Sequence, residues 1–220
     1  MRVLVTGGTR GIGAAVAEAF EAERAKVVVS SRTGGIRGDV SKDAERIVAA
    51  AAKKLGGLDV LVNCAGVSDP RAWTDDLDAV TPEFWNRVLQ TDLWGTFACS
   101  RAAARRMKSG AIVNIGSIPA LVGDADGLLY AVAKAGVIGL TKSLAVSLAP
   151  KIRVNCVAFG SIETGWVDWL APAQRKAYAA AIPMRRFGRR EDAAEAVVYL
   201  AKNRWTTGQT LVLDGGETRL

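Results

Sequence analysis

The stretch that decides the fold is Met1-Arg-Val-Leu-Val-Thr6-Gly-Gly-Thr-Arg10-Gly-Ile-Gly13. Its first half is a run of branched apolar residues that predicts a buried strand, Arg2–Thr6. Its second half is a glycine-rich turn, after which an alanine-rich pattern predicts a helix over residues 12–23. Glycines let such a turn approach a pyrophosphate, which the amino end of the helix then binds. A first strand, a glycine turn and a first helix in this order predict a dinucleotide site. The residues expected to contact the dinucleotide here are Gly7, Thr9, Arg10, Gly11, Ile12 and Gly13.

The rest of the chain alternates short apolar runs with longer helical patterns. Further strands are expected at residues 26–31, near 36–40, and at 58–63, 111–116, 153–158 and 210–213. Further helices are expected at residues 41–55, 82–107, 128–148 and 191–202. Apolar strands separated by helices predict a parallel sheet of about seven strands, covered on both faces. That is the doubly wound, Rossmann-type α/β fold. A chain of 220 residues without linkers or repeats is expected to form a single domain, 1–220.

Residues 161–190 have no obvious strand role. They contain Pro172, Pro183 and the large aromatic side chains Trp166, Trp169 and Tyr178. A long irregular segment of this kind predicts a lid over a pocket, and an ordinary surface excursion is the alternative.

Composition excludes several classes of function. The formal charge is +7, but the basic residues are scattered and no aromatic residues are interleaved with them, so nucleic-acid binding is not expected. No apolar run approaches the roughly 18 residues that a membrane span needs. Cys64, Cys99 and Cys156 are widely spaced and the chain has no histidine, so a metal site is not expected. Free buried thiols favour a reducing, cytoplasmic location.

The end of the second expected strand indicates which dinucleotide is bound. An acidic residue usually holds the adenosine ribose there, but this strand ends Ser30-Ser31-Arg32. Arg32 and Arg10 would bring two guanidinium groups to the place of a 2′-phosphate, which favours NADP(H) over NAD(H). The alternative is that both arginines are solvated loop residues.

Three polar residues in the second half of the chain suggest proton-transfer chemistry. Tyr130 and Lys134 are four positions apart in an expected helix and therefore share one of its faces. A neighbouring ammonium favours the phenolate, which suits Tyr130 to donating and accepting a proton. Ser117 ends the preceding strand. Taken alone, the spacing is better explained by a surface tyrosine above a solvated lysine.

These features together resemble the short-chain dehydrogenase/reductase family over essentially the whole chain. Within the family the chain looks most like the bacterial 3-oxoacyl-acyl-carrier-protein reductases. The motifs that carry the resemblance are TGxxxGxG at 6–13, Asp39-Val40, Asn63-Cys64-Ala65-Gly66, Asn114-Ile115-Gly116-Ser117, Tyr130-x-x-x-Lys134, Arg153 to Ala158 and Gly208 to Gly216.

The resemblance implies a role for each matching residue. Tyr130 would give a proton to a substrate carbonyl oxygen while the cofactor supplies a hydride, Ser117 would orient that oxygen, and Lys134 would hold the nicotinamide ribose. The remaining cofactor contacts implied by the family pattern are Asp39, Val40, Asn63, Ala65, Gly66, Ile162 and Thr164.

Asp92 is a departure from the family, which usually has Asn at this place. The Asn is thought to act through its backbone carbonyl, which survives the substitution, so activity is expected. A carboxylate there is also able to pair with Lys134 and weaken its effect on Tyr130.

The substrate and the assembly follow less directly. A 3-oxoacyl thioester, free or bound to an acyl carrier protein, is one candidate substrate, while Trp166 and Trp169 would equally suit a compact cyclic or aromatic ketone. The alternative activity is that of a dehydrogenase of a cyclic alcohol or a dihydrodiol. A non-catalytic NADP-binding sensor is the rival function. The family resemblance implies a homotetramer or homodimer formed through the helices at 82–107 and 128–148. The apolar residues that would form this surface on the first helix are Leu89, Leu93, Trp94 and Phe97.

Overall fold

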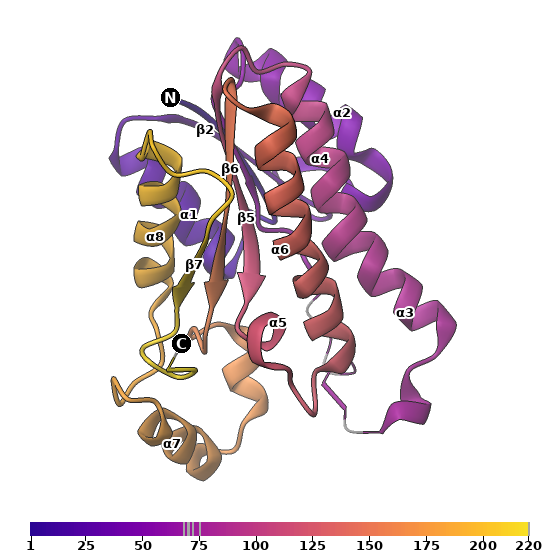
Figure 1. The fold of residues 1–220 in the computed structure, drawn as a ribbon, viewed down its shortest axis with the longest axis vertical. Helices are drawn as coiled ribbons and strands as arrows, with labels where there is room; N and C mark the ends of the chain where they lie inside the picture. Colours follow the sequence, from indigo (N-terminus) through magenta and orange to yellow (C-terminus); the bar gives the residue numbers. More distant parts are fainter. Residues whose placement is uncertain (68, 70, 72, 75, 220) are drawn as a thin grey trace.

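The computed structural model describes residues 1–67, 69, 71, 73–74 and 76–219, and its centre is a parallel sheet (Figure 1). The strands run in the spatial order β3-β2-β1-β4-β5-β6-β7. Their bounds are β1(Arg2–Thr6), β2(Lys26–Ser31), β3(Ile36–Arg37), β4(Val60–Asn63), β5(Gly110–Ser117), β6(Ile152–Phe159) and β7(Thr210–Leu213). The order reverses between β1 and β4, which is where doubly wound folds bind their ligands. The predicted fold class is confirmed.

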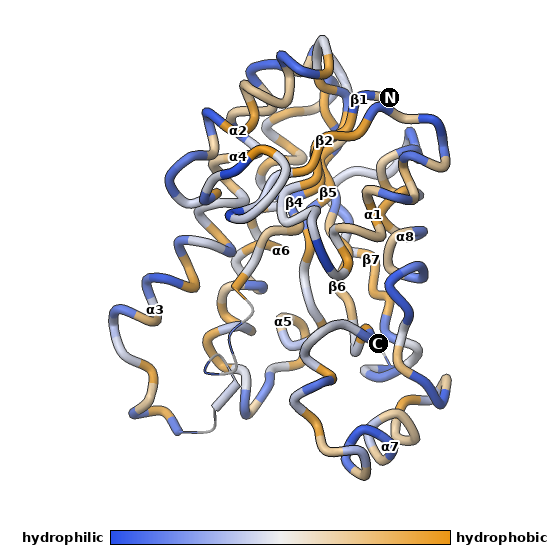
Figure 2. The backbone as a smooth tube through the Cα atoms, turned by 180° about the vertical axis from the view of Figure 1, so that it is seen from behind, coloured by the Kyte–Doolittle hydropathy of each residue, from blue (hydrophilic) through white to orange (hydrophobic). Residues whose placement is uncertain are grey.

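Helices cover both faces of this sheet. Those on one face are α1(Gly11–Ala22) and α8(Arg190–Lys202), and those on the other are α2(Val40–Leu55), α4(Gly95–Ala104) and α6(Leu128–Leu148). Strand β1 shows why both layers are needed: Val3 and Val5 pack against the first layer, and Leu4 packs against the second. Because successive side chains point to opposite faces, a strand with two buried faces reads as one apolar run. Figure 2 shows this apolar centre in orange.

The prediction of one continuous helix over residues 82–107 is wrong. The structure has α3(Pro82–Leu89), a π-helical segment η3(Gln90–Trp94) and then α4, which ends at Ala104. The hydroxyl of Thr96, in the first turn of α4, donates to the backbone carbonyl of Asp92 in the π-helical segment at 2.6 Å. A π segment inserts one residue into a helix, and such insertions are frequent at functional sites. Apolar periodicity does not reveal them.

The strand predicted near residues 36–40 is also shorter than expected, since β3 ends at Arg37. Asp39 ends the extended run because its carboxylate accepts hydrogen bonds from the backbone and the hydroxyl of Ser41. That arrangement caps α2, which therefore begins at Val40.

The segment predicted as a lid lies at the end of the sheet to which the strands point (Figure 1). It contains the short helix η4(Gly165–Trp169) and α7(Pro172–Ala181), neither of which was predicted. Trp166 packs with Phe187 and Tyr178, with ring centres 5.8 and 5.9 Å away, so this segment has a small apolar core of its own. The other short elements are η2(Leu77–Ala79) and α5(Pro119–Val122).

Helix α6 is, within the described residues, the one helix long and apolar enough by length and composition to cross a membrane. It packs against β5 and β6, and these are the contacts of a helix that covers a sheet.

Candidate active site

A cavity of about 2470 Å³ opens at the carboxyl ends of the strands. Its walls come from the glycine turn after β1, the ends of β2, β4, β5 and β6, the start of α6 and the segment 161–190. Parallel strands end at the same edge of a sheet, so residues far apart in the sequence meet here.

The glycine turn is packed directly against the turn that follows β4. Gly7 has φ +67°, and a Cβ at this position would lie 2.8 Å from the backbone of Ala65. The hydroxyl of Thr6 accepts hydrogen bonds from the backbone N–H groups of Cys64 and Ala65, both at 3.2 Å. A Cβ at Gly13 would lie 2.3 Å from the carbonyl oxygen of Gly7. The backbone of the glycine turn is therefore packed against its neighbours as closely as the glycines allow, and this leaves a cradle that fits a pyrophosphate.

Arg10 and Arg32 both line the cavity and are exposed. They come from two separate segments: Arg10 stands immediately before α1, and Arg32 follows β2. The β2 turn is held by Ser31, whose hydroxyl accepts from the N–H of Gly34 at 2.8 Å. Two cationic side chains at this end of the cavity fit an anionic group on the adenosine half of a dinucleotide.

Asp39 and Val40 line the same end of the cavity. Partial burial acts to raise the pKa of Asp39, but the hydrogen bonds from Ser41 and the nearby charge of Arg32 outweigh it and hold that pKa below its usual value. Asp39 is therefore a carboxylate at neutral pH, and its side chain is occupied in capping α2.

Asn63 is placed differently from what the family pattern implied. It is 4% exposed and does not line the cavity. Its amide N–H donates to the side chains of Asn114 at 2.8 Å and Ser100 at 2.9 Å, beneath the sheet edge. Asn63 thus fixes the end of β4, whereas Ala65 and Gly66 face the cavity.

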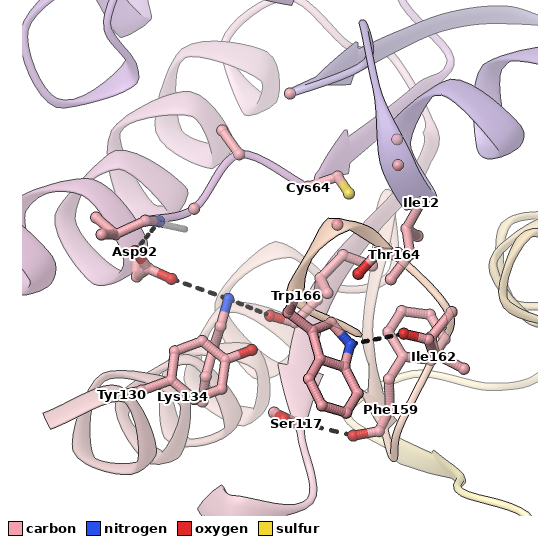
Figure 3. Close-up of a pocket in the computed structure, with 18 of the residues that line it drawn as sticks. Ile12, Cys64, Asp92, Ser117, Tyr130, Lys134, Phe159, Ile162, Thr164 and Trp166 are labelled. Carbon is pink, nitrogen blue, oxygen red and sulfur yellow. Dashed lines mark hydrogen bonds and ion pairs between the residues drawn. The ribbon is translucent and has the colours of Figure 1, made fainter. Parts of the chain in front are cut away.

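Ser117, Tyr130 and Lys134 come together in this cavity (Figure 3). Ser117 ends β5, and its hydroxyl donates to the carbonyl of Phe159 at 3.4 Å. Tyr130 and Lys134 lie one turn apart on α6, with the ammonium nitrogen 5.5 Å from the centre of the phenol ring.

Asp92 joins this group as a direct partner of Lys134. Its Oδ1 lies 3.1 Å from the lysine Nζ, and both side chains are almost completely buried. The second carboxylate oxygen accepts from the N–H of Val67 at 2.8 Å, and the lysine also donates to the carbonyl of Ile115 at 3.1 Å. Burial acts to lower the pKa of Lys134, but the charge of Asp92 and its hydrogen bond raise it above its usual value. A Cβ at Gly66 would lie 2.9 Å from Asp92 Oδ1, so this glycine makes room for the pair.

Ile162 and Thr164 follow β6 and line the cavity opposite the glycine turn. A Cβ at Gly11 would lie 3.8 Å from the methyl group of Thr164. The carbonyl of Ile162 accepts from the indole N–H of Trp166 at 2.7 Å, which fixes the start of the segment 161–190 (Figure 3).

Among the lining residues that the sequence reasoning missed, Trp73 and Glu217 contact other residues of the site. Trp73 lies in the loop after β4, and its ring centre is 4.8 Å from that of Tyr130. Glu217 lies beyond β7 and accepts hydrogen bonds from the backbone and hydroxyl of Ser161. Neither belongs to a periodic element or to a family motif, so no local pattern marked them.

The arrangement is suited to moving a proton at a substrate oxygen between Ser117 and Tyr130, beside a cradle for a dinucleotide. Within the described ranges, no group of three metal-ligating side chains is found.

Comparison with known proteins places this site in a family. Residues 7–218 match a family model described as "Enoyl-(Acyl carrier protein) reductase". A granaticin polyketide synthase putative ketoacyl reductase of Streptomyces violaceoruber is 40% identical, with 97% of this chain and 94% of that protein aligned. A cis-4-hydroxycyclohexanecarboxylate dehydrogenase of Sinomonas cyclohexanicum is 39% identical, over 98% of this chain and 95% of that protein.

A 3-oxoacyl-[acyl-carrier-protein] reductase of Vibrio cholerae is 37% identical, over 97% of this chain and 95% of that protein. Among solved structures, ElxO with NADP bound superposes with a TM-score of 0.90 at 33% identity, covering 99% of this chain and 98% of that one. The similarity therefore extends over nearly the full length of each protein.

Proposed function

The chain belongs to the short-chain dehydrogenase/reductase family, and we propose that it interconverts a carbonyl compound and a secondary alcohol with NADP(H) as the cofactor. Members of this family named among its relatives are oxidoreductases acting on such groups. A bound nicotinamide would supply or accept the hydride, and the residues of this chain would handle the proton and the substrate oxygen.

One observation carries the proposal: Ser117, Tyr130 and Lys134 line the same cavity as the glycine turn. In the reductive direction, Tyr130 gives its phenolic proton to the developing alkoxide, and Ser117 donates a hydrogen bond to the same oxygen. Lys134 donates one N–H to the carbonyl of Ile115, and its ammonium is ion-paired with Asp92. Because an ammonium has three N–H donors, at least one remains for a hydroxyl of the nicotinamide ribose.

The preference for NADP(H) rests on Arg10 and Arg32. Both are exposed side chains at the adenosine end of the cavity, where a 2′-phosphate would lie. The structural relative ElxO is described with NADP bound, which supports the same choice. Asp39 does not oppose it, because its carboxylate is already engaged by Ser41.

Two substrate classes have support. The ketoacyl and 3-oxoacyl reductases among the relatives favour a 3-oxoacyl thioester, which an acyl carrier protein would present. The relative that acts on a hydroxycyclohexane carboxylate favours a cyclic alcohol or ketone.

The test is a panel of acetoacetyl thioesters, cyclic ketones and sugars with NADPH and purified protein. Native protein is expected to oxidise NADPH with at least one of them. Tyr130→Phe is expected to abolish turnover and leave NADPH affinity unchanged, because it removes only the proton donor. Tight NADPH binding without any carbonyl reduction would instead support a non-catalytic sensor.

We further propose a cytoplasmic homotetramer or homodimer with residues 161–190 as its lid. Cys64, Cys99 and Cys156 are all free thiols, which supports a reducing compartment. Trp94 is exposed on η3, and Val132 and Val146 are exposed on α6, which gives these two elements apolar surface for a partner copy. Light scattering in solution tests the assembly.

A further inference from the structure

We propose that Trp73 and Trp169 form a specificity wall that selects a cyclic ketone, in which the carbonyl carbon is part of the ring. This inference rests on the proposed function and deepens it, because it names the substrate class of the same site. Its evidence is an aromatic contact that extends from the lid segment to the proton donor.

Trp73 is the centre of this contact. Its ring centre lies 4.8 Å from that of Tyr130 with the planes tilted by 38°, and 5.8 Å from that of Trp169 in an edge-to-face arrangement. Three separate segments are joined: the loop after β4, the helix α6 and η4. These distances lie within the range at which aromatic pairs attract one another.

Gly127 also lies beside Trp73. It stands immediately before α6, and a Cβ there would lie 2.9 Å from the carboxylate of Asp124 and 3.3 Å from the Cδ1 atom of Trp73. Trp73 thus lies between Tyr130, Trp169 and the start of α6, beside the phenol that would meet the substrate oxygen.

Both indoles keep apolar surface toward the cavity. Trp73 is half-buried, Trp169 is 44% exposed, and both line the cavity. Trp166 also lines the cavity (Figure 3), but it packs on Tyr178 and Phe187, and its indole N–H donates to the carbonyl of Ile162. Of these three indoles, Trp73 and Trp169 are the two that aromatic contacts join to Tyr130.

A ring fits such a wall better than an open chain does. A carbonyl oxygen held by Tyr130 and Ser117 places the flanking carbon atoms close to Trp73. A flat or alicyclic ring covers the indole with little loss of conformational freedom, whereas an open acyl chain must be ordered before it makes the same contact. The site therefore gains more from a cyclic ketone.

The test compares cyclohexanone with an acetoacetyl thioester as substrates of the native enzyme, Trp73→Ala and Trp73→Phe. For Trp73→Ala, kcat/KM for cyclohexanone is expected to fall by about tenfold or more, mainly through KM, since an aromatic contact is lost. Because Trp73 packs on Tyr130, some loss is also expected for the thioester, but the loss for cyclohexanone is expected to be at least about fivefold greater. Trp73→Phe should recover most of the loss. Trp205→Ala is the control, because Trp205 is 97% exposed and does not line the cavity.

Trp169→Ala serves as a second variant if Trp73→Ala does not fold, and the same selective loss is expected from it. An equal loss for both substrates, or no loss for either, overturns this inference while the proposed function stands. Native enzyme that reduces no carbonyl compound overturns the proposed function itself, so the two failures are distinguishable.

Discussion

Replacing Asp92 with Asn is expected to move the pH dependence of alcohol oxidation to lower pH by about one unit or somewhat more. Oxidation needs Tyr130 as the phenolate, and the buried carboxylate of Asp92 opposes the formation of a second negative charge nearby. The variant removes that charge while keeping a side chain of nearly the same shape.

The size of the shift can be worked from the structure. Lys134 Nζ lies 3.1 Å from Asp92 Oδ1 and 5.5 Å from the centre of the Tyr130 ring. The carboxylate oxygen is therefore no more than about 8.6 Å from the ring centre and about 11.4 Å from the phenolate oxygen, which carries the charge. At an effective dielectric constant of about 20, two unit charges at this larger distance repel by about 1.5 kcal/mol. This energy corresponds to about 1.1 pH units.

The assay is kcat/KM for oxidation of the best alcohol substrate, measured across the pH range at saturating NADP⁺. Asp168→Asn is the matched control, because it removes an exposed carboxylate of the same cavity. Its profile should follow that of the native enzyme, since exposed charges are screened by solvent and salt.

The same variant is expected to be less stable. Asp92 has two acceptor oxygens, for Val67 and Lys134, whereas Asn has one, so a buried donor loses its partner. Breaking a buried ion pair from one side costs about 3 kcal/mol or more. Because the pKa of Lys134 is raised in the folded state, the pair stabilises the protein below the unfolded-state pKa, and this stabilisation is lost as the pH rises through the folded-state pKa. The loss of stability in Asp92→Asn should therefore be present throughout the neutral pH range.

The profiles must be measured below the melting temperature of the variant. Superimposable curves would refute the electrostatic coupling of Asp92 to Tyr130. A shift of the Asp92→Asn profile to higher pH would refute the predicted sign of this coupling.

Four further variants test the cofactor site and the core. Arg10→Ala and Arg32→Ala should each weaken NADPH binding, measured by fluorescence titration, by about 10- to 100-fold, because each removes one charged hydrogen bond to a phosphate. NADH binding, measured in the same way, should change little. Gly13→Ala should abolish dinucleotide binding and lower the free energy of unfolding by at least about 1–3 kcal/mol, because the added Cβ would lie 2.3 Å from the carbonyl oxygen of Gly7. Retained NADPH affinity in a calorimetric titration would contradict this expectation. Phe20 is a fully buried residue of α1. Phe20→Ala should lower the free energy of unfolding, measured in urea, by about 3–5 kcal/mol. A decrease below about 1 kcal/mol would show that Phe20 is not packed as described.

The fold was largely predictable because its signals are local. Apolar runs and helical periods gave β1, β2, β7 and α6 with the bounds that the structure has. The missed features are long-range or irregular: η3 interrupts a continuous apolar pattern, and α7 is a helix without a buried residue. Periodicity reports burial, so a helix that buries no residue leaves no such pattern.

By itself, the sequence determined the order of strands and helices, the glycine turn and the positions of Ser117, Tyr130 and Lys134. These depend on residue type and on spacings of a few positions. The pairing of Asp92 with Lys134, which the sequence left open, was decided by the tertiary structure, and the packing of Trp73 on Tyr130 was visible only there. Each of these contacts joins segments more than forty residues apart, and the sheet edge that brings them together exists only after all the strands have paired. The sequence determines the order of the elements and their local chemistry, whereas tertiary packing determines which residue pairs with a buried charge.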